Sequence, residues 1–305
     1  MVVRHFLTVS DISGDEFSKV LDLADELKAD RRQRTDLEGK SIGMIFEKPS
    51  TRTRISFEVG ITQLGAHAVV LNAGELQLGR GETVEDTARI LSGYLDAVVV
   101  RTFEQSRLET LAEHGSIPVI NALSDFSHPC QALADLQTVR EYKGQLAGLR
   151  LAYLGDGNNV AHSLLRAGAM AGMHVAIGCP PGYEPIPQVV EGARAQAAQT
   201  GGSVTVTADP LAAARDADVV YTDVWASMGQ EAEAEARVLM FRPFQVGPDV
   251  MEAARPDAIV MHCLPAHRGE EIAAEVIDGD QSVVWTQAEN RLHSQKALLL
   301  FLLGQ

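Results

Sequence analysis

The chain has 305 residues, of which 46% are hydrophobic and 22% charged, and its net charge is −15 at pH 7. This composition is typical of a globular protein with about two domains. The acidic balance disfavours sequence-independent binding to nucleic acid or attachment to an anionic membrane surface, because both require a basic surface.

The lengths of the apolar runs and the spacing of the cysteines indicate the cellular compartment of the protein. The longest apolar run, 297–303, is far shorter than the about 18 residues that a membrane span needs. The first residues contain no apolar segment of the kind that a secretory signal has. Cys130, Cys179 and Cys263 show no Cys-x-x-Cys spacing, which favours reduced thiols and disfavours a cysteine-based zinc site. We therefore expect a cytoplasmic protein with no membrane partner.

Helical and strand patterns alternate along the chain. The first series predicts helices at 14–28, 51–64, 83–94, 107–113 and 131–142, and strands at 42–46, 68–71, 97–100 and 118–120. The second series predicts strands at 151–154, 174–177, 204–206, 219–221 and 258–261, and helices at 159–170, 187–199, 210–215 and 287–302. Strands separated by helices imply two parallel-sheet α/β domains, which we place at 1–143 and 148–286. Residues 229–248 are predicted to form a long loop, a feature that is often a lid.

Ligands of parallel sheets bind beyond the carboxyl ends of the strands, so the residues that follow each strand are the candidates for chemistry. After strand 42–46, Ser50 is a natural N-cap for the next helix, and Arg52 and Arg54 lie in its first turn. Free N–H groups, hydroxyls and guanidinium groups at a helix N-terminus favour phosphate. A capped surface helix with solvated arginines explains these residues equally well. The chain has no Walker pattern at this position.

Two further strands of the first series end in polar residues. Arg101 follows strand 97–100, and His128 and Gln131 come after strand 118–120 at the start of a helix. Taken singly, Arg101 fits a salt bridge at the domain rim, and His128 fits a helix-entry turn. Together they offer cations and neutral donors to an anion that carries a carbonyl group.

The second series begins with a glycine-rich turn. The sequence Gly-Asp-Gly-Asn-Asn at 155–159 half-resembles a dinucleotide fingerprint, but Val160 replaces the third glycine and no acid follows the next strand. We therefore reject NAD binding and expect the glycines to form a tight turn that aims an asparagine side chain. Asp223 follows strand 219–221, where it could also be a simple helix cap.

Strand 258–261 is followed by His262-Cys263-Leu264-Pro265, a turn that can hold a cis proline. His262 and Cys263 suggest a catalytic pair or metal ligands, although two residues give no complete zinc set and a buried thiol is common. The two series together suggest group transfer from a phosphate-bearing donor to an amine, with the two substrates meeting between the domains.

The motifs resemble those of the aspartate/ornithine carbamoyltransferase family. Four of them match the family as a whole: 50–54, 101–102, 128–131 and 262–265. Three more resemble its ornithine branch: 155–159, 223–229 and 288–292. The similarity runs in order from about residue 4 to residue 303.

The resemblance implies transfer of the carbamoyl group of carbamoyl phosphate to the δ-amine of ornithine, without a metal or another cofactor. It implies that carbamoyl phosphate is bound by Ser50, Thr51, Arg52, Thr53, Gln77, Arg101, His128, Gln131, Cys263, Leu264 and Arg291. It implies that ornithine is bound by Asn159, Asp223, Ser227 and Met228. The catalytic residues would be Arg101, His128, Asp223 and Cys263.

The resemblance also implies an active site in the cleft between the two α/β domains and a C-terminal helix, 287–305, that returns to the first domain. It implies a homotrimer or a multiple of trimers, in which Gln77 can reach a neighbouring subunit. Two alternatives remain open: a sister enzyme that uses aspartate, putrescine or an N-acylated ornithine, and a non-catalytic anion-binding subunit. An aspartate pocket should show extra cations in the second domain, where this chain has Asp223, Ser227 and Met228.

Overall fold

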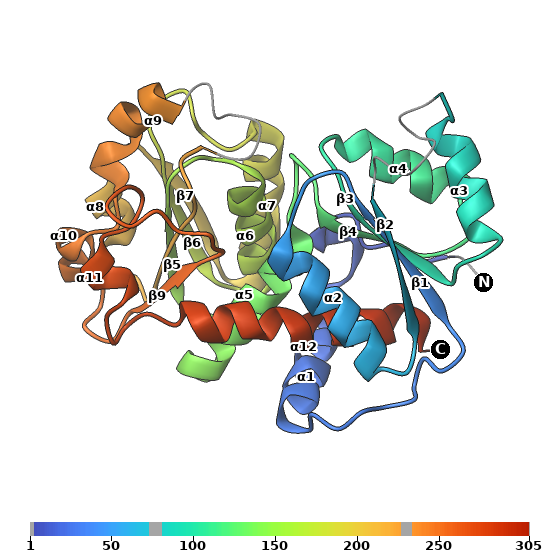
Figure 1. Cartoon of the computed structure of the whole chain (residues 1–305). Coiled ribbons are helices and arrows are strands. Elements are labelled where there is room, and N and C mark those ends of the chain that lie inside the picture. Colours follow the sequence, from blue (N-terminus) through green and yellow to red (C-terminus); the bar gives the residue numbers. More distant parts are fainter. Residues whose placement is uncertain (1–2, 73–80, 227–233, 305) are drawn as a thin grey trace. The chain divides into compact units, whose positions relative to one another are not determined.

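The computed structural model describes residues 3–72, 81–226 and 234–304, which form two compact units (Figure 1). The first unit comprises residues 1–134 and 289–305, and the second comprises residues 135–288. The chain leaves the first unit along α5 (Pro129–Lys143) and returns to it along α12 (Val284–Leu303). The C-terminal helix thus belongs mainly to the first unit. No helix within the described ranges has both the length and the apolar character to cross a membrane.

The first unit is built on a parallel sheet. Among the described residues it has four strands, in the order β2-β1-β3-β4. They are β1 (Ser41–Phe46), β2 (His67–Asn72), β3 (Ala97–Arg101) and β4 (Val119–Leu123). Every residue of β3 is buried, and its sequence is accordingly a continuous apolar run that ends in arginine.

The helices of the first unit cover both faces of this sheet. Besides α12 and the first residues of α5, the described helices of this unit are η1 (Val9–Asp11), α1 (Gly14–Ala29), α2 (Thr51–Gln63), α3 (Val84–Ser92) and α4 (Gln105–His114). The chain moves in one direction from β1 to β2 and in the opposite direction from β2 to β3, so right-handed crossovers place α2 on one face and α3 on the other. Figure 1 shows α3 and α4 together, away from α2.

The second unit is also a parallel sheet whose strands are connected by helices, and this sheet is larger. Among the described residues its strand order is β7-β6-β5-β8-β9. The strands are β5 (Arg150–Leu154), β6 (His174–Gly178), β7 (Ser203–Thr207), β8 (Val219–Thr222) and β9 (Ile259–His262). The helices are α6 (Asn159–Met170), α7 (Pro187–Thr200), α8 (Pro210–Ala214), α9 (Ala234–Phe241), η5 (Arg242–Phe244), α10 (Pro248–Ala253) and α11 (Ala274–Ile277).

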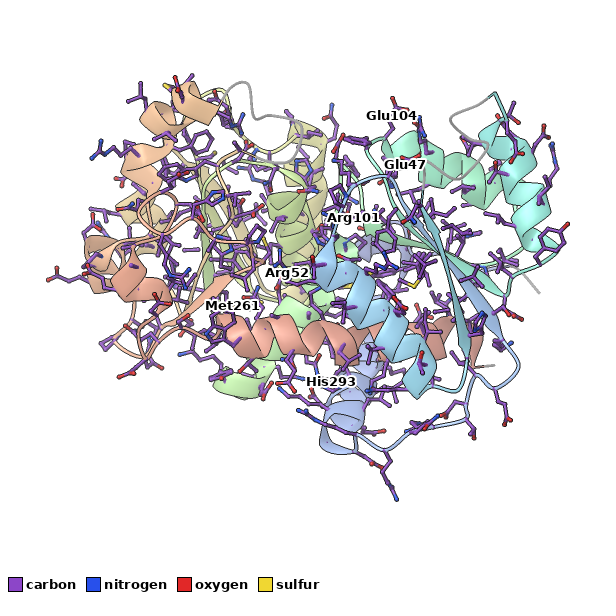
Figure 2. All side chains as sticks on the ribbon, in the orientation of Figure 1. Glu47, Arg52, Arg101, Glu104, Met261 and His293 are labelled. Atoms are coloured by element: carbon purple, nitrogen blue, oxygen red, sulfur yellow. The ribbon has the colours of Figure 1, made fainter. Side chains whose placement is uncertain are left out.

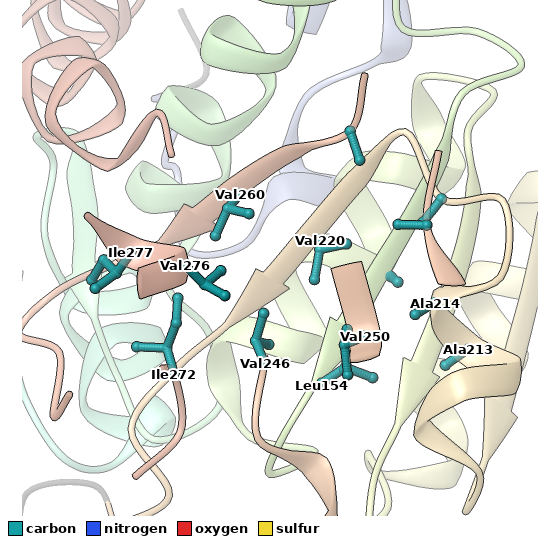
Figure 3. Packing of buried hydrophobic residues seen from close by; sticks show 14 of the residues in the cluster. Leu154, Ala213, Ala214, Val220, Val246, Val250, Val260, Ile272, Val276 and Ile277 are labelled. Atoms are coloured by element: carbon teal, nitrogen blue, oxygen red, sulfur yellow. The ribbon is translucent and has the colours of Figure 1, made fainter. Parts of the chain in front are cut away.

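A buried aliphatic cluster joins the strands of the second unit to its short helices (Figure 3). Leu154, Val220 and Val260 come from three neighbouring strands, whereas Val250 and Ile277 come from α10 and α11. Full burial of such a side chain stabilises the fold by about 1.5–3 kcal/mol. The two short helices are therefore parts of the core of this unit.

The predicted elements differ from the structure mainly after β8. The prediction of a loop over 229–248 is wrong in part, because α9 and η5 occupy much of that range. Phe241 and Phe244 are buried there, so apolar packing stabilises a helix that the polar sequence did not indicate. The helices α10 and α11 were not predicted, since six and four residues are too few to display a helical period. The remaining elements agree within a few residues, although β4 runs on to Leu123.

One buried histidine has a consequence for stability. His293 on α12 is 1% exposed, and neither of its ring nitrogens has a hydrogen-bond partner among the described residues (Figure 2). Burial lowers its pKa to about 4, and the charges of Lys296 and Arg31 act in the same direction. His293 is therefore neutral in the folded protein at neutral pH.

We expect the free energy of unfolding to fall as the pH drops from about 6.5 towards 4, because the unfolded chain then binds a proton that the folded chain rejects. Over this pH range the free energy of unfolding of the His293→Gln variant should fall by about 1–3 kcal/mol less than that of the wild type. Urea unfolding at several pH values measures this difference, with exposed His67 changed to Gln as the control. An unchanged slope in His293→Gln would contradict the assignment.

Candidate active site

The first candidate set lies at the N-terminus of α2. Ser50 has extended backbone angles, with φ −162°, and its hydroxyl accepts a hydrogen bond of 3.3 Å from the Thr53 N–H. The side chain thus satisfies one of the free N–H groups of the first turn, while Thr51 is exposed and Arg52 half-buried. The helix dipole, the unpaired amides and the guanidinium together favour a phosphate group.

Two more guanidinium groups lie at the hydroxyl of Thr53, which is fully buried. Arg291 Nη2 donates to Thr53 Oγ1 over 2.9 Å, and Arg101 Nη1 lies 3.5 Å from the same oxygen. Arg101 ends β3, and Figure 2 labels it together with Arg52. Arg291 lies on α12, so the C-terminal helix supplies a cation to this set.

His128 precedes α5, and Gln131 lies in its first turn; they are 5% and 1% exposed. Burial lowers the pKa of His128 well below 6.5, and the positive charges of Arg291, Arg101 and Arg52 lower it further. The imidazole is therefore neutral at neutral pH. A neutral imidazole beside guanidinium groups can donate a hydrogen bond to a carbonyl oxygen without adding a charge.

The segment between β1 and α2 is held by residues that sequence analysis did not single out. Glu47 accepts hydrogen bonds from the Thr102 hydroxyl and, over 2.6 Å, from Arg107 Nη1. Buried Lys48 forms an ion pair with Asp125, which follows β4. These contacts fix the approach to α2 against the ends of β3 and β4. The detectable signal was an acid and a base directly after a strand, but their partners are distant in sequence.

The second candidate set centres on Asp223, which follows β8 and is 7% exposed. Its Oδ1 accepts hydrogen bonds from the Val224 N–H over 2.8 Å and from the Cys263 thiol over 2.9 Å. Its Oδ2 accepts one from Asn158 Nδ2 over 3.0 Å. The carboxylate is thereby held in one orientation by neutral donors from three segments.

Asn158 donates the hydrogen bond to Asp223, and it directly precedes Asn159, the residue that the family resemblance implies for ornithine binding. Asn158 is the N-cap of α6, and its Oδ1 accepts from the Val160 and Ala161 N–H groups at 2.9 and 3.3 Å. Asn159 is the first residue of that helix. At Gly157 a Cβ atom would lie 2.2 Å from a neighbouring backbone nitrogen, so only glycine fits this turn.

Cys263 and Leu264 follow β9 and belong to the second unit. The Leu264–Pro265 peptide bond is cis, and the Leu264 φ is +56°. Both ring nitrogens of the preceding His262 are engaged: Nδ1 accepts from the Leu264 N–H over 2.8 Å, and Nε2 lies 3.1 Å from Glu271 Oε1. His262 therefore shapes this turn and makes no pair with the Cys263 thiol.

Within the described part of the chain, one cluster of side chains has its potential ligand atoms close enough together to hold a metal ion. Potential ligand atoms of His267, Glu270 and Glu271 lie within 4.8 Å of one another. In its buried member, Glu271, Oε1 accepts hydrogen bonds from His262 Nε2 and from the His267 N–H, whereas Oε2 has no hydrogen-bond partner among the described residues. Two of the three side chains are exposed, and such groups are common on protein surfaces.

Gln77, Ser227 and Met228 lie outside the described residues. The other predicted site residues divide between the units. Ser50, Thr51, Arg52, Thr53, Arg101, His128, Gln131 and Arg291 belong to the first unit, and Asn159, Asp223, Cys263 and Leu264 belong to the second.

The sequence matches two family models. Residues 4–141 match the carbamoyl-P binding domain of aspartate/ornithine carbamoyltransferase, and residues 147–302 match its Asp/Orn binding domain. The chain belongs to the aspartate/ornithine carbamoyltransferase family. In this carbamoyltransferase family member the two matched ranges are separated by residues 142–146, which are the end of α5 and the segment that follows it.

Individual relatives within the family are similar over nearly their whole length. An ornithine carbamoyltransferase from Parafrankia sp. is 61% identical, covering 100% of this chain and 98% of the relative. An anabolic ornithine carbamoyltransferase from Pyrococcus furiosus is 54% identical, covering 99% of this chain and 96% of the relative. The solved ornithine carbamoyltransferase from Pyrococcus furiosus has a TM-score of 0.96 at 54% identity, covering 99% and 97% of the two chains.

The contact between Asn158 and Asp223 can be tested by charge. The Asn158→Asp variant keeps the helix cap but places a second carboxylate 3.0 Å from Asp223. The two carboxylates repel each other unless one of them takes up a proton. We expect its loss of unfolding free energy relative to wild type to be larger at pH 7.5 than at pH 4.5 by about 1–2 kcal/mol.

Urea unfolding at both pH values gives this comparison. The control is Asn158→Ser, which also keeps a cap but adds no charge. An equal loss at both pH values for Asn158→Asp would show that the two side chains do not face each other.

Proposed function

We propose that this family member transfers the carbamoyl group of carbamoyl phosphate to the δ-amine of L-ornithine, giving L-citrulline and phosphate. A bond forms between the amine nitrogen and the carbamoyl carbon, the bond from that carbon to the phosphate oxygen breaks, and the amine loses a proton. The observation that carries the proposal is the Asp223 carboxylate, which is held by Asn158 and Cys263 in the unit that matches the Asp/Orn binding domain. A fixed carboxylate suits a cationic diamine acceptor.

The first domain, which we place at residues 1–143 and 287–305, would bind carbamoyl phosphate. The helix N-terminus at Ser50, Thr51 and Arg52 would hold the phosphate, as its capped first turn and its positive charge support. The remaining contacts to this substrate would come from Thr53, Gln77, Arg101, His128, Gln131, Cys263, Leu264 and Arg291.

Carbonyl polarisation is the central chemical task of this set. As the amine attacks, the carbamoyl oxygen gains negative charge, which Arg101, the Thr53 hydroxyl and neutral His128 would stabilise. The low pKa of His128 supports this role. A neutral imidazole can donate a hydrogen bond to the carbamoyl oxygen without adding a positive charge that would hold the leaving phosphate. Positioning and electrostatics would supply the rate, with no metal, cofactor or covalent enzyme intermediate.

The second domain, which we place at residues 148–286, would bind ornithine through Asn159, Asp223, Ser227 and Met228. Asp223 would attract and orient the amino groups, and its neighbour Cys263 would border the δ-amine. Both residues would help to remove the proton of that amine. We further propose a cytoplasmic homotrimer or a multiple of trimers that acts in arginine biosynthesis, with no nucleic-acid or membrane partner.

The Asp223→Asn variant keeps the shape of the side chain and removes its charge. We expect KM for ornithine to rise at least roughly tenfold and kcat to fall, because a charged hydrogen bond in a closed site is lost. KM for carbamoyl phosphate should change much less. Citrulline formation with each substrate varied in turn measures these constants.

The wild-type rate at subsaturating ornithine should rise between about pH 7 and 9, because an alkyl amine with a pKa of about 10.4 becomes more often neutral. A panel of amines provides the control. If aspartate is the better acceptor, or if Asp223→Asn leaves the ornithine constants intact, the assignment to ornithine is wrong.

The proposed trimer makes Gln77 a test of subunit exchange. If Gln77 serves a neighbouring subunit, Gln77→Ala and Arg52→Ala proteins should each be impaired, yet mixed assemblies should partly recover activity because some sites contain both native residues. Activity is measured after unfolding the two proteins together and refolding them, with each protein alone as the control. No recovery in verified mixed assemblies would mean that each site is built from one chain.

A further inference from the structure

Arg237 on α9 is a buried cation near the second candidate set, the residues that centre on Asp223. Its side chain is 5% exposed, and its guanidinium forms an ion pair with Asp156 through Nη2 and Oδ2. Its Nε donates a hydrogen bond of 2.6 Å to the Trp225 carbonyl oxygen. The guanidinium carbon also lies 4.9 Å from the centre of the Tyr183 ring and 5.2 Å from that of Phe241. Cation–π contacts of this kind favour a guanidinium over an ammonium group.

The contacts of Arg237 with Asp156 and with the Trp225 carbonyl both lie close in sequence to residues that form the Asn158–Asp223 contact. Asp156 lies two residues before Asn158, which donates to Asp223. Trp225 lies two residues after Asp223 and is 3% exposed. One guanidinium therefore joins the turn after β5 to the segment after β8, and these are the two segments that form the Asn158–Asp223 contact.

The charges at this position require a counter-ion. Asp156 and Asp223 are 14% and 7% exposed, and two carboxylates that have lost most of their water are costly to keep ionised together. The pKa of Asp156 is raised to about 6, because burial and the charge of Asp223 outweigh the lowering effect of Arg237. Asp223 itself is contacted by neutral donors, the Asn158 amide and the Cys263 thiol.

We propose that Arg237 is a positioning and charge-balancing residue for the cationic acceptor: it neutralises Asp156 and holds the Trp225 carbonyl, so that the negative charge of Asp223 is left for the amine. The inference rests on the proposed function, since it assigns the charge balance of the ornithine site. It also concerns specificity, because a guanidinium engaged by Asp156 favours an amine over an acidic acceptor at this position.

Four proteins test the charge balance: wild type, Asp156→Asn, Arg237→Met and the double variant. Asp156→Asn leaves a buried cation near Asp223 that competes with the substrate, so KM for ornithine should rise at least roughly tenfold. In the double variant both charges are gone, and KM for ornithine should return to within about threefold of Arg237→Met alone. KM for carbamoyl phosphate should stay within about twofold of wild type in all four proteins.

The pH profile separates charge balance from a purely structural role. Among the described residues, the titratable and charged groups that interact electrostatically with Asp156 include Arg237 on α9, Asp223 after β8, Tyr153 on β5 and Cys179 after β6. Because Arg237 lowers the pKa of Asp156, the inflection of kcat/KM for ornithine near pH 6 should move to higher pH in Arg237→Met. It should disappear from the double variant, which lacks the titrating carboxyl group.

The matched control for the loss of an arginine is Arg255→Met, because Arg255 also pairs with aspartates but is 53% exposed. It should leave both KM values unchanged. Strictly additive effects of the two single substitutions, or unchanged ornithine constants in an active enzyme, would overturn the inference alone. Absence of citrulline formation in wild type would overturn the proposed function and this inference with it.

Discussion

The reversal of strand order within each parallel sheet is the constraint on which both candidate sets depend. In the first unit the order reverses between β1 and β3, and in the second unit it reverses between β5 and β8. Helices leave the two strands on opposite faces of the sheet at such a point, so no crossover covers their carboxyl ends. The polar residues that follow the two strands can therefore meet, as Glu47 and Thr102 do in one unit and Asn158 and Asp223 in the other.

The two candidate sets carry charge of opposite sign. In the first unit burial lowers the pKa of His128, and the positive charges of Arg291, Arg101 and Arg52 lower it further. In the second unit two carboxylates lie in neighbouring turns, and Arg237 offsets one of them. A phosphate-bearing anion suits the first environment and a protonated amine the second, because each ligand completes the charge that its set lacks.

Residues that follow strands could be predicted from the sequence, because strand runs are apolar and a polar residue at their end is conspicuous. Arg101, Asp223 and the cap at Ser50 are of this kind: Arg101 is the last residue of β3, Asp223 directly follows β8, and Ser50 caps the helix that comes after β1. Residues that act through distant partners could not be predicted. Asn158 looked like a turn residue, Arg237 lay in a segment expected to be a loop, and Glu47 faces partners that are 55 and 60 positions away. Short helices such as α10 could not be predicted for a related reason, because packing against the rest of the core decides whether such short segments are helical.

The three thiols occupy very different surroundings. Cys130 and Cys179 are 0% and 1% exposed, and burial raises the pKa of each to about 12, so neither forms a thiolate at neutral pH. Cys263 is partly exposed and hydrogen-bonded to Asp223. An alkylating reagent applied to the folded chain would therefore reach Cys263 before the two buried thiols. An amine held at Asp223 would then be detectable as slower alkylation of Cys263, without any engineered cysteine.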